Sequence, residues 1–102
     1  MKNEINAIRL NESDNIAIAL KNIRKGDSIV VNDFDKQITV KKGVPYGHKV
    51  SLREIDKGEK ILKYGECMGI AKLKIEEGYH VHTENVRGLN EKEHERILNN
   101  QL

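Results

Sequence analysis

The sequence contains little cysteine, proline or aromatic residue. Among its 102 residues are one cysteine, one proline, four aromatic residues and no tryptophan. With Cys67 as the single cysteine, no disulfide can form within the chain, and this predicts a reducing, cytoplasmic location. So few aromatic side chains argue against a base-stacking surface for single-stranded nucleic acid.

The sequence also lacks an excess of one charge and any long hydrophobic run. Its 18 basic and 16 acidic residues are interspersed, giving a net charge of +2 and no basic patch of the kind that binds DNA. No run approaches the roughly 20 apolar residues of a membrane span, and the start MKNEINAIRL lacks the apolar stretch of a signal peptide. We therefore expect one domain with no nucleic-acid or membrane partner.

A short glycine motif occurs four times in the chain. In each copy, an aliphatic residue, a glycine and a second aliphatic residue are separated by two residues. Glycine at such a point allows a positive φ, and the flanking aliphatic side chains can anchor the turn in a core. The spacing between copies is irregular, so the motif predicts a recurring turn rather than a solenoid. The copies are Ile23-Gly26-Ile29, Val44-Gly47-Val50, Ile55-Gly58-Ile61 and Ile75-Gly78-Val81.

Short strand patterns dominate the chain and predict a mainly β domain, barrel-like or folded over. The stretch NDFDK at residues 32–36 has the composition of a hairpin turn between SIVV and QITV. Alternation of Ala71, Leu73 and Ile75 with lysines predicts a half-buried strand. The predicted strands are residues 7–10, 28–31, 37–40, 48–52, 60–63, 70–75 and 80–83.

Two helices are predicted. Residues 13–23 begin with the capping candidates Ser13 and Asp14, and the apolar residues that follow have helical spacing. Residues 89–100 contain Asn90 as a cap with Glu93 three residues later. This second helix has few apolar residues, so we expect it to pack lightly or to dock on a partner.

The stretch EEGYHVHTEN holds the most distinctive polar pattern. On an extended strand, His80, His82 and Glu84 point to one side. Two imidazoles and a carboxylate can bind a divalent cation, although two histidines do not complete a coordination shell. The spacing is equally compatible with a polar strand surface, and both interpretations stay open at this point.

Two other histidines and Cys67 each allow a structural and a functional interpretation. In VPYGHKVSL, His48 shares a strand face with Val50, which fits either a partly buried, hydrogen-bonded ring or an acid–base or ligand role. His94 lies in the charged tail and is expected to be solvated. Cys67 is typical of a small apolar residue more than of a nucleophile.

Taken in order, several motifs resemble the SAF-like domain of the altronate/galactarate dehydratase family, in the form found as a separate small subunit. They are DNIAIAL, YGHKVSLREIDKGEKILKYG and CMGIAKLKIEEGYHVHTEN, and the likeness covers residues 5–87. The resemblance implies a SAF/β-clip fold of short strands and hairpins with one or two short helices. It divides the chain into a SAF-like domain at 1–88 and a helical tail at 89–102.

The resemblance also implies an activity. Family members are metal-dependent hydro-lyases that use Fe(II) or Mn(II) and remove water from a 2,3-dihydroxy sugar acid, giving a 2-keto-3-deoxy acid. This chain would be a small subunit, inactive until a large catalytic subunit binds, and a homo-oligomer is compatible with this. The alternatives are the small subunit of a sulfolactate sulfo-lyase and a non-catalytic module that binds sugar acids.

The same resemblance suggests roles for individual residues. The third histidine that close relatives often carry is Glu84 here, which puts the metal, the substrate or the activity in question. The suggested roles are catalytic for His48 and His82, substrate-binding for Lys49 and Asn85, and metal-binding for His80, His82 and Glu84.

Overall fold

A computed structural model describes residues 4–101 as two small sheets and one helix. Within these residues no helix is both long enough and apolar enough to cross a membrane. The elements are β1 (Ala7–Ile8), β2 (Ile16–Ala19), β3 (Ser28–Val31), β4 (Phe34–Thr39), β5 (Lys49–Ser51), β6 (Lys60–Lys63), β7 (Glu66–Ala71), β8 (His80–Val81), β9 (Val86–Arg87) and α1 (Glu91–Gln101).

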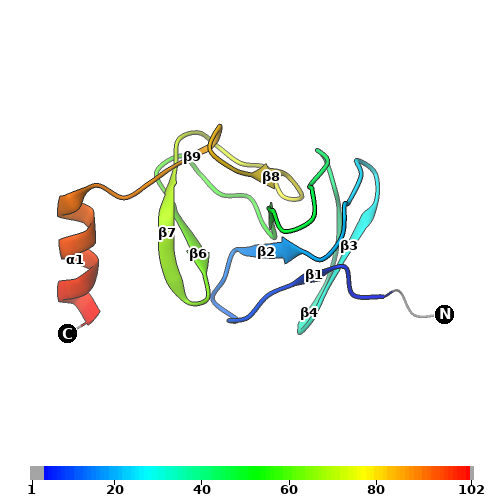
Figure 1. Ribbon diagram of the computed structural model, residues 1–102, viewed down its shortest axis with the longest axis horizontal. Helices are drawn as coiled ribbons and strands as arrows, with labels where there is room; N and C mark the ends of the chain where they lie inside the picture. The colour runs from blue at the N-terminus through cyan, green and yellow to red at the C-terminus, as the bar shows by residue number, and fades with distance from the viewer. Residues whose placement is uncertain (1–3, 102) are drawn as a thin grey trace.

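The strands form a six-stranded sheet in the order β4-β3-β1-β2-β5-β8 and a three-stranded sheet in the order β6-β7-β9. All neighbours are antiparallel except β1 and β3. The β3–β4 and β6–β7 hairpins stand at opposite sides of the body, with β1 and β2 between them (Figure 1). This curled, mainly β arrangement confirms the predicted SAF/β-clip class.

The four glycine motifs form four turns of the same design. The motif glycines have φ angles of 93°, 82°, 89° and 81°. In each turn the glycine N–H donates to the carbonyl of a residue on another segment, and that residue donates its N–H back to the residue after the glycine. The pairs are Val40 with Gly26–Asp27, Ala19 with Gly47–His48, Ala71 with Gly58–Glu59 and Ser51 with Gly78–Tyr79.

These turns divide the body into two similar halves. In each half, a glycine turn leads into a hairpin with a register shift, and a second glycine turn follows it. The first aliphatic residues of the two turns in a half form a bridge, Ile23 with Val44 and Ile55 with Ile75. The four motifs are therefore two pairs, Gly26 with Gly47 and Gly58 with Gly78, and the separation of the glycines is nearly the same within each pair.

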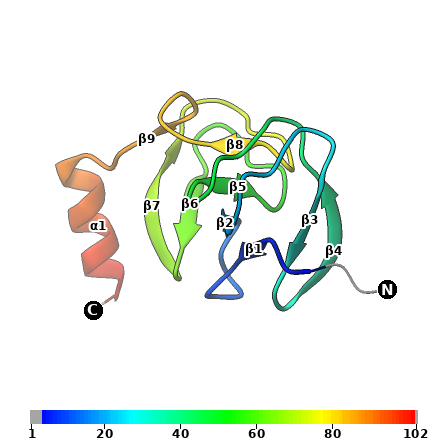
Figure 2. The ribbon, with the colours of Figure 1, turned by 45° about the vertical axis from the view of Figure 1, so that its right-hand side comes forward.

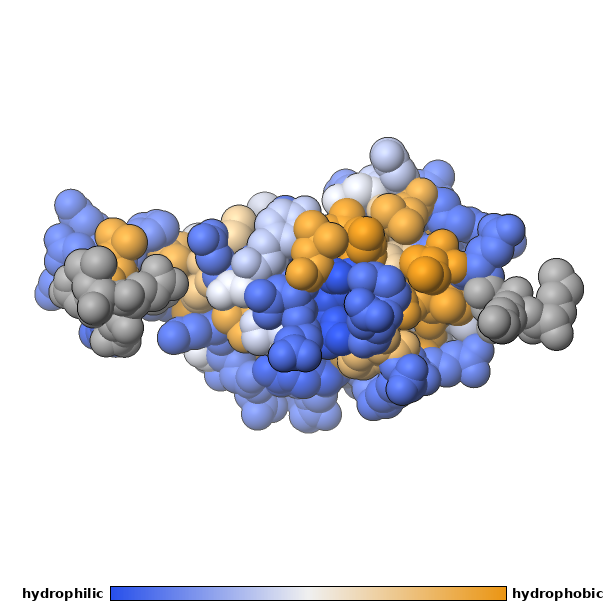
Figure 3. Space-filling view, turned by 90° about the horizontal axis from the view of Figure 1, so that it is seen from below, coloured by the Kyte–Doolittle hydropathy of each residue, from blue (hydrophilic) through white to orange (hydrophobic). Residues whose placement is uncertain are grey.

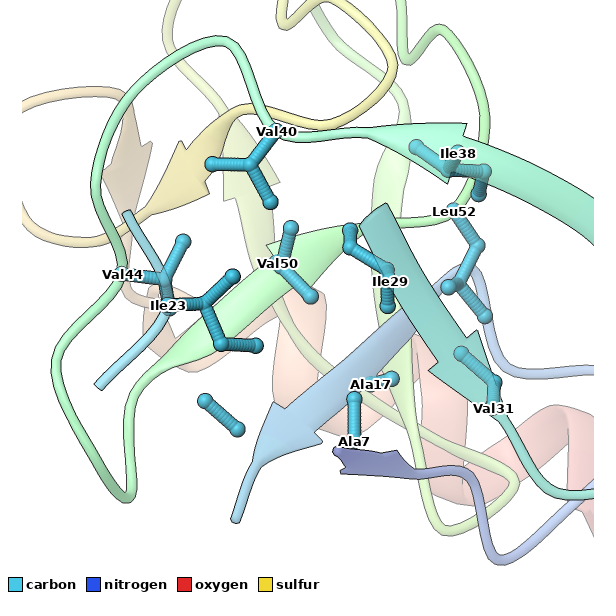
Figure 4. Close-up of a cluster of buried hydrophobic side chains, with 11 residues drawn as sticks. Ala7, Ala17, Ile23, Ile29, Val31, Ile38, Val40, Val44, Val50 and Leu52 are labelled. Carbon is cyan, nitrogen blue, oxygen red and sulfur yellow. The ribbon is translucent and has the colours of Figure 1, made fainter. Parts of the chain in front are cut away.

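Each half has its own group of buried aliphatic side chains. The larger cluster surrounds Val50 and contains Ile23, Val44 and Ile29 from the first half (Figure 4). The smaller cluster contains Ile55, Ile61, Ile75 and Val81 from the second half. The motif aliphatics therefore form much of both cores, as their spacing predicts.

Most predicted strands exist, with shifted ends. Strands β3 and β6 have the predicted bounds, and the β3–β4 hairpin turns at Asn32 and Asp33, so it is tighter than predicted. The strand predicted at 70–75 instead ends at Ala71, and Leu73 is exposed because the chain bends there. Strands β2 and β9 have no counterpart in the prediction.

The helix predicted at 13–23 is wrong. This segment contains strand β2, whose residues Ile16, Ala17 and Ala19 are all buried because β2 lies between β1 and β5. A strand buried on both faces carries a continuous apolar run, which also satisfies helical spacing. Asp14 does not cap a helix; its carboxylate accepts hydrogen bonds from the N–H groups of Tyr64 and Gly65 at the β6–β7 turn.

The predicted tail helix is confirmed as α1, and so is its cap. The Asn90 side chain accepts a hydrogen bond from the Glu93 N–H, and Glu93 accepts one from the Asn90 N–H. Arg87 of β9 makes two hydrogen bonds to the same carboxylate, at 2.7 and 2.8 Å. The helix stands beside β7, joined to the body by the segment after β9 (Figure 2).

The surface of the described residues is not uniformly polar. Seen from below, hydrophobic residues gather around a polar centre on the body (Figure 3). Several large apolar side chains are about half exposed or more, among them Leu10, Tyr46, Met68, Leu73 and Leu98. Met68 and Leu98 lie in β7 and α1, next to the site described below.

Two glycines with nearly equal φ angles allow the turn design to be tested. A Cβ on Gly47 would meet no atom within 4 Å, whereas a Cβ on Gly78 would collide with the Thr39 carbonyl oxygen. We expect Gly47→Ala to cost about 1 kcal/mol through backbone strain alone. Gly78→Ala should cost roughly 1–3 kcal/mol more, because the β4 backbone must move. Urea unfolding measures both, and equal losses would contradict this account.

Candidate functional site

Three histidines converge where the two halves meet. Strand β5 follows the second turn of the first half and β8 follows the second turn of the other, and these strands pair antiparallel with Lys49 opposite Val81 and Val50 opposite His80. His48 lies just before β5 and His82 just after β8. The sheet therefore brings together residues that are more than thirty positions apart in the sequence.

The three imidazole rings are in direct contact. His48 Nδ1 lies 2.9 Å from His80 Nε2, a hydrogen bond between the two rings. The rings of His80 and His82 are stacked, with centroids 4.1 Å apart and planes at 10°. The predicted shared side of His80 and His82 is thus present, and His48 joins it from the other half.

Asn85 fixes the loop that carries His82. Its Nδ2 donates to the His80 carbonyl and its Oδ1 accepts from the His82 N–H, at 2.8 and 2.9 Å. The Asn85 N–H in turn donates to the His82 carbonyl. The side chain is buried, and both of its polar atoms hold backbone on either side of Val81. In this structure Asn85 therefore orients the two histidines.

A cleft of about 540 Å³ opens beside the histidines. His48, Lys49, His82 and Arg87 line it, with Met68 on the β7 side, while His80 lies behind them and is buried. Burial, and secondarily the nearby positive charge of Lys63, lowers the pKa of Lys49. Lys49 and Arg87 bring positive charge to the lining, where Arg87 is paired with Glu93, and the imidazoles of His48 and His82 also line the cleft.

Burial is also the main reason why the pKa of His80 falls from 6.5 to about 4. The neighbouring rings of His82 and His48 and the ammonium of Lys42 add to this effect, and Glu84 opposes it. His80 is consequently neutral at neutral pH. A neutral imidazole donates at one nitrogen and accepts at the other, so the contact has two possible arrangements: His80 Nε2 accepts from the Nδ1–H of His48, or donates to His48 Nδ1.

Among the described residues, those predicted to bind a metal do not form a complete coordination site by themselves. Glu84 is 74% exposed, and its Oε1 lies 3.8 Å from His82 Nε2, so these two side chains can reach one cation. The Nε2 of His80 is already engaged by His48. Within the described part of the chain, no three His, Cys, Asp or Glu side chains are arranged to hold a metal ion.

Three residues near the histidines were not predicted from the sequence: Arg87, Lys63 and Met68. Each lies on a strand of the second sheet, and only the packing of that sheet against β5 and β8 brings it near the histidines. Arg87 is the basic residue at the end of the segment HVHTENVR, but its position at the cleft follows only from the fold.

Comparison with known proteins places this site in a family. The model of the altronate/galactarate dehydratase SAF domain matches residues 5–89, which include all the cleft histidines. Altronate dehydratase of Escherichia coli is 36% identical over 80 residues, and that of Bacillus subtilis is 34% identical over the same length. Each match covers 78% of this chain but only 16% of the relative.

A third relative is much shorter. The alpha subunit of (2R)-sulfolactate sulfo-lyase from Paracoccus pantotrophus is 36% identical over 59 residues, which are 58% of this chain and 88% of that subunit. Regions similar to this chain thus occur both as a small part of a long enzyme and as most of a short subunit. The matched region and the β-clip fold agree: this chain belongs to the family of altronate/galactarate dehydratase SAF domains.

Proposed function

We propose that this chain is the small subunit of a metal-dependent sugar-acid dehydratase. The proposal is carried by the convergence of His48, His80 and His82 beside Lys49 at an open cleft, in a chain of the SAF family. The chain matches only 16% of the length of the altronate dehydratases. Since the sulfo-lyase alpha subunit contains the matched region in a separate short chain, we infer that a large catalytic chain supplies the rest of the active site.

The reaction we propose needs a base and an acid. Dehydrating a 2,3-dihydroxy acid removes the proton on the carbon next to the carboxylate and expels the hydroxyl group of the following carbon, which leaves as water once protonated. The resulting enol becomes the 2-keto-3-deoxy acid. Imidazole is suited to both proton transfers, because its pKa lies near neutral pH.

The contact between His48 and His80 suggests how the base is prepared. When neutral His80 accepts a hydrogen bond at Nε2 from the Nδ1–H of His48, the Nε2 of His48 is left unprotonated. That nitrogen can take the substrate proton. His82, also at the cleft, is then the candidate acid for the leaving hydroxyl group.

Lys49 is the candidate partner for the substrate carboxylate. It lines the cleft beside His48, and its ammonium is partly desolvated. A carboxylate bound there would restore the favourable interaction that burial removes, since an opposite charge stabilises the ammonium form. Asn85 contributes by holding the His82 loop in place, and a direct contact with substrate remains a prediction.

As the alternative to its acid role, His82 would contribute with Glu84 to an Fe(II) or Mn(II) site whose other ligands come from the large chain, because a ring nitrogen that binds a metal ion cannot also donate the proton. The 3.8 Å between their ligand atoms supports this assignment, while His80 is held by His48. A divalent cation bound there would stabilise the negative charge that develops on the substrate oxygens.

The sulfo-lyase relative supports a second candidate. The match to this chain covers 88% of its alpha subunit, so that subunit is similar to this chain over most of its own length. In a sulfolactate sulfo-lyase, the same base would remove a proton while sulfite leaves in place of water. The ammonium of Lys49 at the cleft suits either substrate, since both are anionic.

Reconstitution tests the proposal. The chain mixed with a separately produced large chain, similar to the part of altronate dehydratase outside the match, and Fe(II) or Mn(II) should form 2-keto-3-deoxy acid from altronate. His48→Ala and His82→Ala should each lower kcat by about 100-fold or more, because each removes a proton-transfer group. Lys57→Ala, at the exposed turn before Gly58, is the matched control and should keep full activity.

Three results would separate the candidates. Sulfite release from sulfolactate without sugar-acid turnover would favour the sulfo-lyase. Binding of altronate by the lone chain, unaffected by a chelator and without turnover in the complex, would favour a binding module. Full activity of both histidine variants would remove the catalytic role altogether.

The depressed pKa of His80 predicts how folding depends on pH. The unfolded chain binds a proton at this residue near pH 6.5, but the folded chain binds it only near pH 4. Between these values the unfolded state holds more protons, so the contribution of neutral His80 is complete above pH 6.5 and is lost as the pH falls towards 4. NMR titration of the ring measures this directly, and a midpoint near 6.5 would contradict it.

A further inference from the structure

A second groove lies next to the histidine cleft, between β7 and α1. Its volume is about 510 Å³, and its apolar lining consists of Cys67, Met68, Leu89 and Leu98. Met68 and Leu98 are 49% and 60% exposed, although both are large apolar side chains. Glu66 and His94 add polar groups to the lining. The groove thus presents an apolar surface that nothing in this chain covers among the described residues.

The helix that forms one wall is attached mainly at its start. Arg87 and the Asn90–Glu93 cap hold its first turn, and Figure 2 shows the rest of α1 beside the body. An isolated helix of eleven residues is marginal in water. Additional apolar contact along Leu98 would stabilise it, and a partner in the groove would provide that contact.

The groove and the cleft are continuous. Met68 and Gly88 line both of them, and Arg87 lines the cleft while its guanidinium holds α1 through Glu93. A polypeptide that completes the histidine cleft must therefore lie directly beside the groove. In the altronate dehydratases the match covers 16% of the length, so a large further region exists that could take this position.

We propose that the groove between β7 and α1 is the docking surface for the large catalytic chain, which inserts apolar side chains between Met68 and Leu98. This inference rests on the proposed small-subunit function and extends it to a defined surface. Docking at this point would order α1 and place the large chain's groups at the adjacent cleft, so assembly and completion of the site are one event.

The single cysteine offers a test in the unmodified protein. Cys67 lines the groove and is partly exposed. Its rate of reaction with a thiol reagent should fall about tenfold when the separately purified large chain is added to ninety per cent saturation, because only the free fraction reacts. A thiol that reacts equally fast in an active complex would overturn the docking proposal and leave the proposed function intact.

Charge substitutions test the same surface. Met68→Glu and Leu98→Glu should each weaken the complex by about tenfold or more, since a charge would be buried in an apolar contact. Leu73→Glu is the matched control, because Leu73 is 51% exposed and lies outside the groove. Calorimetry gives the affinities, and circular dichroism checks that the variants are folded.

The outcomes distinguish the two levels of the proposal. Normal binding by both groove variants overturns the docking surface only. A wild-type chain that neither binds nor activates the large chain overturns the small-subunit function as well. Protection of Cys67 in the lone chain, increasing with its own concentration, would assign the groove to a second copy and overturn the large chain as its occupant.

Discussion

The antiparallel pairing of β5 with β8 is the interaction on which the site depends. It places Val50 opposite His80 and so brings the His48 ring within hydrogen-bonding distance of His80. The glycine turns that precede both strands determine where the pairing begins. Val50 and Val81, on the paired strands, are buried in different clusters, so the packing of both halves holds the histidines together. The short pairing of β5 with β8 therefore both positions the histidines and joins the two hydrophobic clusters.

Local patterns predicted the parts of the fold that local physics determines. The motif glycines signal positive φ angles, and the hairpin composition around Asn32 signals a turn, because both follow from the residues themselves. Strand β2 was predicted as helix, since Ile16, Ala17 and Ala19 are buried on both faces and alternation is lost. That burial depends on neighbours from distant segments, which no local window contains.

The site, like the fold, could be predicted only where local geometry determines it. His80 and His82 lie on the same side because side chains alternate along a strand, so their proximity could be predicted from the sequence. The approach of His48 depends on the register of two strands far apart in sequence, and only the family resemblance pointed to it. The structural use of Asn85 and the position of Arg87 at the cleft became visible only with the backbone in place.

The likeness of the two halves bears on how the domain arose. Each half is a glycine turn, a hairpin and a second glycine turn, and the histidines occupy the boundary between the halves. Two copies of a single ancestral peptide, paired about a two-fold axis, would already place equivalent side chains face to face at that boundary. Gene duplication and fusion would then free each copy to diverge, so that Lys49 and His80, each two residues after its turn glycine, acquired different side chains at one ancestral position.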